Sequence, residues 1–245
     1  MLLFTHFLKK YSPWLIICVG VLLYATHIWD ELPPPQLRFT RIVEAAAAAF
    51  AVVPISLNLS EPTEIELGLA CGIRTARFAF TRFIPCLLYT LVPATVISAL
   101  YNYVPRITDP EYIGIIPIYV PGNYSYLLAA STAVTVLFFA SLTLFLRVAL
   151  RNCFVALSAG LISIITMHSF SNSLMVGTSP LALSYVNPFV TSYFVGNGIG
   201  DLFPQIGLQN VWTVNRVIFF AISVALLLAS YLLLRRERLH EVADD

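Results

Sequence analysis

Long apolar runs with almost no charge follow one another along the chain, and they constrain its fold more than any other feature. Of the 245 residues, 58% are hydrophobic and only 11% are charged, whereas an ordinary soluble domain carries about 25% charged residues. No soluble core needs this much apolar surface, so the composition predicts an all-α, polytopic membrane protein with one domain, residues 1–245. Because the sequence has no basic patch with interleaved aromatics, we expect no nucleic-acid partner.

Six of the apolar runs are long enough to cross a membrane as helices. The predicted spans are at about residues 13–29, 42–59, 83–103, 124–146, 152–172 and 214–234. No small-residue cleavage site follows the first run, so we interpret it as a retained helix rather than a signal peptide. The second run holds five consecutive alanines, Ala45 to Ala49. Small side chains let helices approach closely in lipid, and this face is therefore predicted to pack against another helix.

The distribution of lysine and arginine predicts the orientation of these spans. With the N-terminus inside, ten of the 14 basic residues fall in inner segments, and the outer side holds only Arg38, Arg41, Arg106 and Arg216. This is a clear positive-inside bias. Both termini are therefore predicted to be cytoplasmic.

A charged stretch, EPTEIELGLACGIRTARFAFTR at residues 61–82, separates the second and third spans. Its carboxylates come first and its arginines last, which is the order that a helix dipole favours. Pro62 suits a first helical turn, and Thr63 with Glu66 fits a capping box. The stretch is thus predicted to be an amphipathic helix on the inner membrane surface. It can lie on lipid as a plain connector, with its charges as a solvated face, or it can be docked by a soluble partner.

The segment between the fifth and sixth spans, residues 173–212, is apolar but interrupted. Glycines and prolines divide it into pieces that are too short to span a membrane. Short apolar pieces of this kind are typical of re-entrant or interfacial helices. We therefore predict a re-entrant outer hairpin in this segment.

Few residues in the predicted spans could carry chemistry, and no catalytic, cofactor or metal site is predicted. The four cysteines (Cys18, Cys71, Cys86 and Cys153) are widely separated and read as apolar filler. His168 is interpreted as a helix–helix hydrogen bonder, with a proton relay as the alternative. For Glu44, a local ion pair with Arg41 is favoured over a functional intramembrane carboxylate. No Walker A loop is present, so this chain does not bind ATP by that route.

Taken together, these features resemble the permease subunits of ATP-binding cassette transporters, in the ABC-2 class of exporters. The resemblance rests on six spans in about 250 residues and on the acidic-to-basic helix after the second span. It also rests on Asn187-Pro188-Phe189 in a broken outer segment, and on Asn215-Arg216 opening a last span that ends in a basic cluster. In one departure, residues 72–77 (GIRTAR) stand where the family has a proline and a Ser-Arg pair.

The resemblance implies that the inner face of the protein couples to an ATPase and that the outer face gates the pathway. The surface helix would be a coupling helix that fits a groove in a separate ATPase subunit, which alone would bind ATP and Mg. Two permease copies or homologues would enclose one pathway in a bacterial inner membrane, in contact with its lipids. The implied coupling residues are Glu61, Glu64, Glu66, Leu67, Leu69, Arg74 and Arg77. The implied outer-gate residues are Tyr185, Asn187, Pro188, Phe189 and Tyr193.

Two functional classes remain open from the sequence. The first is the permease subunit, whose transported substrate the sequence leaves undefined. The second is a membrane protein of another kind, either a non-transport scaffold or sensor, or an intramembrane enzyme. An enzyme would depend on polar residues at depth, such as His168 or Glu44.

Overall fold

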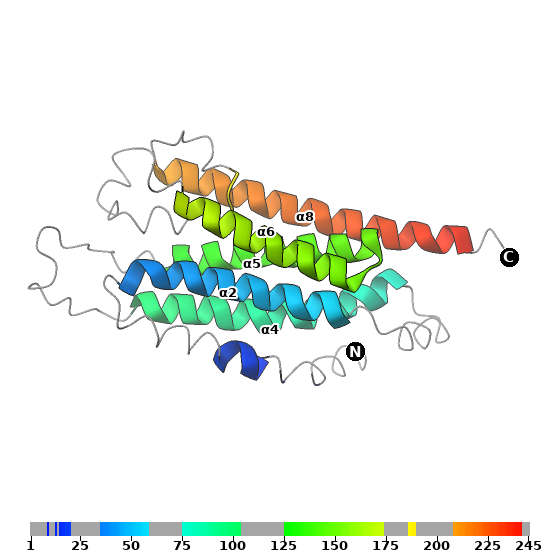
Figure 1. Cartoon of the computed structure of the whole chain (residues 1–245), viewed down its shortest axis with the longest axis horizontal. Helices are drawn as coiled ribbons and strands as arrows, with labels where there is room; N and C mark the ends of the chain where they lie inside the picture. The colour runs from blue at the N-terminus through cyan, green and yellow to red at the C-terminus, as the bar shows by residue number, and fades with distance from the viewer. Residues whose placement is uncertain are drawn as a thin grey trace, which may run out of the picture.

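The computed structural model of the chain describes residues 9, 13, 15–20, 35–58, 75–103, 125–173, 186–189 and 208–241. The regular elements in these ranges are all helices, and the long ones form an elongated bundle (Figure 1). The all-α prediction is therefore confirmed for this part of the chain. The long helices are α2 (Pro35–Asn58), α4 (Thr75–Tyr103), α5 (Ser125–Leu150), α6 (Cys153–Ser173) and α8 (Leu208–Glu241).

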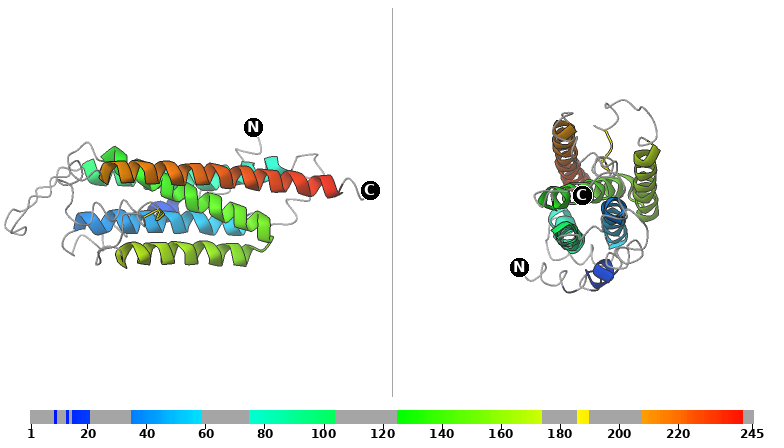
Figure 2. Two further views of the ribbon diagram at one scale, coloured as in Figure 1. Left: turned by 90° about the horizontal axis from the view of Figure 1, so that it is seen from above. Right: turned by 90° about the vertical axis from the view of Figure 1, so that its left-hand side faces the viewer.

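Helix α5 is the centre of this bundle. It contacts each of the other four long helices, and the end-on view in Figure 2 shows them arranged around it. Apolar side chains of α5 are fully buried in two different core clusters: Val136 and Ala140 belong to one and Phe139 to the other. A helix that is apolar around most of its circumference has to be enclosed in this way or exposed to lipid.

The alanine-rich part of α2 is packed against its neighbours, as the sequence predicts. Ala47 and Ala51 join the core cluster shared with α4 and α5, whereas Ala48 and Val52 join the one shared with α5 and α6. All four side chains are fully buried. Two adjacent small-residue stripes thus let α2 approach three helices at once.

Glycine is required at one point of this close packing, Gly160 in α6. A β-carbon there would lie 2.8 Å from Val52 Cγ1 and 3.0 Å from Thr143 Oγ1. Val52 is β-branched and has little rotamer freedom in a helix. The absence of a side chain at residue 160 therefore sets how closely α6 approaches α2 and α5.

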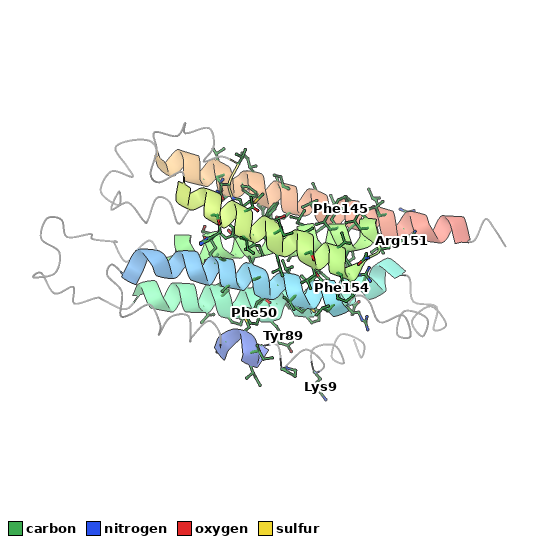
Figure 3. The ribbon with its side chains drawn as sticks, in the orientation of Figure 1. Lys9, Phe50, Tyr89, Phe145, Arg151 and Phe154 are labelled. Atoms are coloured by element: carbon green, nitrogen blue, oxygen red, sulfur yellow. The ribbon has the colours of Figure 1, made fainter. Side chains whose placement is uncertain are left out.

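A two-residue link joins α5 to α6, close to the predicted break between the fourth and fifth spans. Arg151 adopts φ 53°, and its N–H donates to the Arg147 carbonyl at 3.1 Å, which ends α5. Asn152 then caps α6, because its Oδ1 accepts from the N–H groups of Phe154 at 3.0 Å and Val155 at 3.2 Å. Figure 3 shows Arg151 and Phe154 at this end of the bundle, which we call the turn end.

Helix α4 differs from the prediction at its start. The charge pattern predicts a helix boundary between Arg82 and Phe83, but one continuous helix runs from Thr75 to Tyr103. The basic end of the predicted surface helix therefore belongs to the same helix as the third span. Arg82 is buried rather than solvated. The physical reason is that Ala79 and Phe83, on the same side of α4, pack into the bundle.

Three of the described helices are long and apolar enough to cross a membrane. Their apolar windows are Ala79–Val96, Ala129–Leu150 and Thr213–Arg235, while α2 and α6 hold the shorter windows Glu44–Leu57 and Cys153–Ser169. The chain thus has the character of a helical membrane protein. The six-span topology and the orientation stay predictions, and most of the predicted first span lies outside the described residues.

Part of that first span is described as a short helical stretch, residues 15–20. Its Cys18 is buried in the core cluster formed with α2 and α4, against which Phe50 and Tyr89 also pack. Figure 3 shows these two labelled side chains close to the stretch. The interpretation of Cys18 and Cys86 as apolar filler agrees with their burial as free thiols.

Candidate functional site

A buried polar cluster lies at the opposite end of the bundle, where α2, α5 and α8 begin and α6 ends. We call this the cluster end. Its members come from three helices and from a short non-helical segment, residues 186–189, which approaches α5 between α6 and α8 (Figure 1). They sit close to the same boundary of the apolar windows of α2, α5 and α8. The members of the cluster are Glu44, Ser131, Thr135, Asn187, Pro188, Asn215 and Arg216.

Arg216 of α8 is the centre of this cluster, because all three of its guanidinium nitrogens donate hydrogen bonds. Nη1 donates to the hydroxyls of Ser131 and Thr135, both at 2.9 Å, and lies 3.2 Å from the Ser131 carbonyl. Nη2 donates to the carbonyl of Pro188 and, at 2.7 Å, to Asn215 Oδ1, which also accepts from Nε at 3.1 Å. The side chain is only 6% exposed, and a buried guanidinium needs this degree of satisfaction.

Glu44 of α2 supplies the negative charge. Its Oε1 lies 3.6 Å from Arg216 Nη1 and accepts from Thr135 Oγ1 at 2.5 Å and from Ser131 Oγ at 3.4 Å. The partner of Glu44 in the structure is therefore a residue of α8, which the sequence analysis did not predict. The side chain of Arg41, its favoured local partner, lies outside the described residues. Removing one member of a buried ion pair leaves an uncompensated charge, which costs about 3–5 kcal/mol.

The segment 186–189 enters the bundle abruptly. Val186 is 64% exposed, whereas the next three residues are buried and Phe189 is 0% exposed. The Phe189 N–H donates to Asn187 Oδ1 at 2.9 Å, a local turn that asparagine favours. The segment is thus a tight, buried turn in the described part of the predicted outer hairpin.

Three helices hold this turn in place. On α6, the Met167 carbonyl accepts from Asn187 Nδ2 at 3.0 Å. On α8, Asn215 Nδ2 donates to the Asn187 carbonyl at 3.0 Å. On α5, Thr135 Oγ1 lies 3.1 Å from the Pro188 carbonyl.

The ring of Phe189 fills the apolar side of the same site. It stacks on Phe139 with ring centroids 5.5 Å apart, and the His168 ring meets it edge-on at 5.4 Å. Phe138 and Phe219 continue this aromatic core with centroids 4.8 Å apart. His168 therefore packs at a helix–segment contact, within a cluster that binds a peptide turn.

Burial decides what this arrangement can do chemically. Glu44, Thr135 and Asn215 are at most 1% exposed, so a substrate has no access to them while the turn is in place. Among the described residues no group of three or more His, Cys, Asp or Glu side chains could hold a metal ion. The cluster is thus suited to holding segments of the chain together.

The structure brings together some of the residues that the sequence singled out. Asn187, Pro188 and Phe189 meet Asn215 and Arg216, and Glu44 joins them. Ser131 and Thr135 were missed, since isolated hydroxyl residues in an apolar run give no signal beyond their polarity. Arg77 lies in α4, but its side chain is outside the described residues. The other predicted coupling and gate residues are also outside them: Glu61, Glu64, Glu66, Leu67, Leu69, Arg74, Tyr185 and Tyr193.

Comparison with known proteins gives no relative: no protein-family model matches the sequence, and no curated protein matches it.

Proposed function

We propose that this chain is a transmembrane permease subunit of an ATP-binding cassette exporter of the ABC-2 class. The observation that supports the proposal is the contact between two sequence motifs of the resemblance. Asn215 and Arg216, which open the last predicted span, donate to the carbonyls of Asn187 and Pro188 in the predicted outer segment. A permease needs a structured outer closure that is attached to its helices, and this contact supports such a role for the segment.

In this proposal the ATPase acts on residues 61–74, which lie in the chain between the end of α2 and the start of α4, both at the turn end of the bundle (Figure 1). Helices α2 and α4 flank this segment in the chain, contact one another, and both contact α5. A displacement at the turn end would therefore reach the helix that carries Ser131 and Thr135. The ATPase would favour one conformation by binding it more tightly, and the packed helices would transmit the movement.

The proposal includes a second permease copy, membrane lipids around the bundle, six spans and cytoplasmic termini in a bacterial inner membrane. Exposed apolar side chains on α6 and α8 supply surface for lipid or for the second copy, with Phe154 at 70%, Ile162 at 61% and Val217 at 62% exposed. The burial of Glu44 argues against the intramembrane-enzyme alternative. A scaffold or sensor remains the competing class.

The first test is co-purification of the detergent-solubilised chain from its native membrane, with ATP hydrolysis measured on the complex. We expect a soluble ATPase in near-equal amount. Glu64→Arg with Glu66→Arg should weaken its binding at least about tenfold, because reversed charges would meet the complementary groove. The matched control is Glu111→Arg, the same substitution in a predicted outer loop, which should leave the complex intact.

Two results would contradict the proposal. One is a pure, stable chain that carries no ATPase, which would favour a scaffold or sensor. The other is normal ATPase binding and stimulation in the double charge reversal, which would show that residues 61–74 are not the coupling element.

A further inference from the structure

We infer that Arg216 and Glu44 form the fixed half of a latch and that the buried turn at residues 186–189 is its removable half. The inference deepens the proposed function, since it names the residues that would hold an outer closure shut. Its physical basis is independent of the ATPase. The inference rests on which side chains keep their hydrogen-bond and ion-pair partners when the turn leaves the cluster.

The turn lies between two helices with different neighbours: α6 packs on α2 and α5, and α8 packs mainly on α5. Asn187 contacts α6 through the Met167 carbonyl, and its own carbonyl contacts α8 through Asn215. Figures 1 and 2 show the turn between α6 and α8. Its withdrawal would therefore leave these two helices without the element that joins them at the cluster end.

Arg216 keeps most of its partners without the turn. Its Nη2 loses the Pro188 carbonyl but keeps Asn215 Oδ1 at 2.7 Å, and Nη1 keeps both hydroxyls of α5. The counter-charge of Glu44 remains 3.6 Å away. Neither charge loses its counter-charge when the turn leaves. Opening the cluster therefore avoids the free-energy cost of a buried, unpaired charge, which is ordinarily the largest one.

Thr135 behaves in the same way. Its hydroxyl has one proton to donate, and two acceptors lie near it, Glu44 Oε1 at 2.5 Å and the Pro188 carbonyl at 3.1 Å. The shorter contact is the one within the helices. Releasing the turn therefore costs Thr135 the weaker of its two contacts.

The turn itself carries the cost of release. It gives up hydrogen bonds at two carbonyls and at the Asn187 side-chain amide, and the burial of the Phe189 ring against Phe139 and His168. These polar groups can bond water instead, whereas the ring has to be exposed or find another apolar partner. The charged pair thus stays matched in both states, and the hydrogen bonds lost on the helices are mainly those of neutral groups, Asn215 Nδ2 and the Met167 carbonyl.

The test compares hydrogen exchange at residues 186–189 in the purified full-length chain, with exchange in α5 and the unfolding temperature as measures of global stability. Arg216→Lys keeps the positive charge opposite Glu44. A lysine ammonium is a compact group, so it cannot contact Glu44 or Thr135 on one side and the Pro188 carbonyl on the other at the same time. We expect exchange in the turn to rise by about tenfold or more, the factor for one charge-assisted hydrogen bond, with α5 unchanged. The double variant Glu44→Gln/Arg216→Gln, which removes both charges together, should give the same local increase.

The outcomes separate a latch from a purely structural cluster. Exchange that rises equally in the turn and in α5 would overturn the inference, because the cluster would then hold the whole bundle. An unchanged turn in both variants would also overturn it, since Phe189 packing alone would suffice. If the double variant does not fold, Arg216→Lys decides the question. Because no ATPase is needed, a failed co-purification would leave this result intact.

Discussion

The two ends of the bundle are held by different kinds of interaction. At the turn end, α5 and α6 are joined by two residues, and local contacts shape the link: the Arg151 N–H donates to the Arg147 carbonyl, and Asn152 caps α6. At the cluster end, the hydrogen bonds of Glu44 reach residues 87 and 91 positions away in the chain. One end is thus determined by chain connectivity and the other by long-range polar contacts, which require several helices to be in place together.

This difference determines how far the helices can separate at each end. A two-residue link spans at most about 7 Å, so the ends of α5 and α6 cannot separate widely at the turn end. Noncovalent contacts at the cluster end carry no such limit. Substitutions that act on one end only are the direct way to test the contrast.

The largest effect is expected at the cluster end. Arg216→Leu should destabilise the protein by about 3–5 kcal/mol, because Glu44 is left buried without its counter-charge. Thermal unfolding in detergent measures the loss. Adding Glu44→Gln should recover a large part of it. If the single variant were as stable as the original chain, the long-range pair would contribute nothing to stability. The proposed difference between the two ends would then be wrong.

A smaller effect is expected in the middle of the bundle, where packing rather than polarity decides. Gly160→Ala should cost about 1–3 kcal/mol, since the new methyl group overlaps Val52 Cγ1 at 2.8 Å. Val52→Ala in the same chain should relieve the overlap. Gly20→Ala is the matched control: nothing lies within 4 Å of a β-carbon there, so its unfolding temperature should not fall. Equal losses at both glycines would indicate a general backbone effect instead of contact between α2 and α6.

The smallest effects are expected at the turn end. Arg151→Gly should raise stability by about 0.5–1 kcal/mol, because glycine adopts φ 53° without the steric cost that arginine has there. Asn152→Ala, one residue further, should lower stability by about 1 kcal/mol through loss of the α6 cap. Opposite signs at neighbouring residues are the decisive result. Losses at both would show that the Arg151 side chain contributes more than its backbone strain costs.

The elements that the sequence predicted best are those with a local signal. Five consecutive alanines predicted a packed face on α2, and the polar pair Arg151-Asn152 lies at the observed break between α5 and α6. Arg82 shows the limit of such reasoning. Charge order placed it on a surface helix, but burial depends on which side of α4 faces α5, and that is a property of the assembled bundle.

The candidate site was predictable only in part. Asn187-Pro188-Phe189 and Asn215-Arg216 were identified as motifs, and Glu44 as an unusual carboxylate in an apolar run. No sequence pattern connects these motifs with Glu44, whose favoured partner on sequence grounds is the nearby Arg41. Long-range pairing is set by how three helices and one turn meet, and no periodicity in a single helix encodes it.

The pairing of Glu44 with Arg216 also imposes an order in time. Ser131 follows Glu44 by 87 residues and precedes Arg216 by 85, so at ordinary translation rates roughly 10–35 s separate the synthesis of the two charges. During this interval Glu44 lacks its partner on α8, and the hydroxyls of α5 emerge halfway through. A nascent chain that stalls before α8 therefore carries Glu44 without Arg216, a chemical difference between unfinished and finished copies.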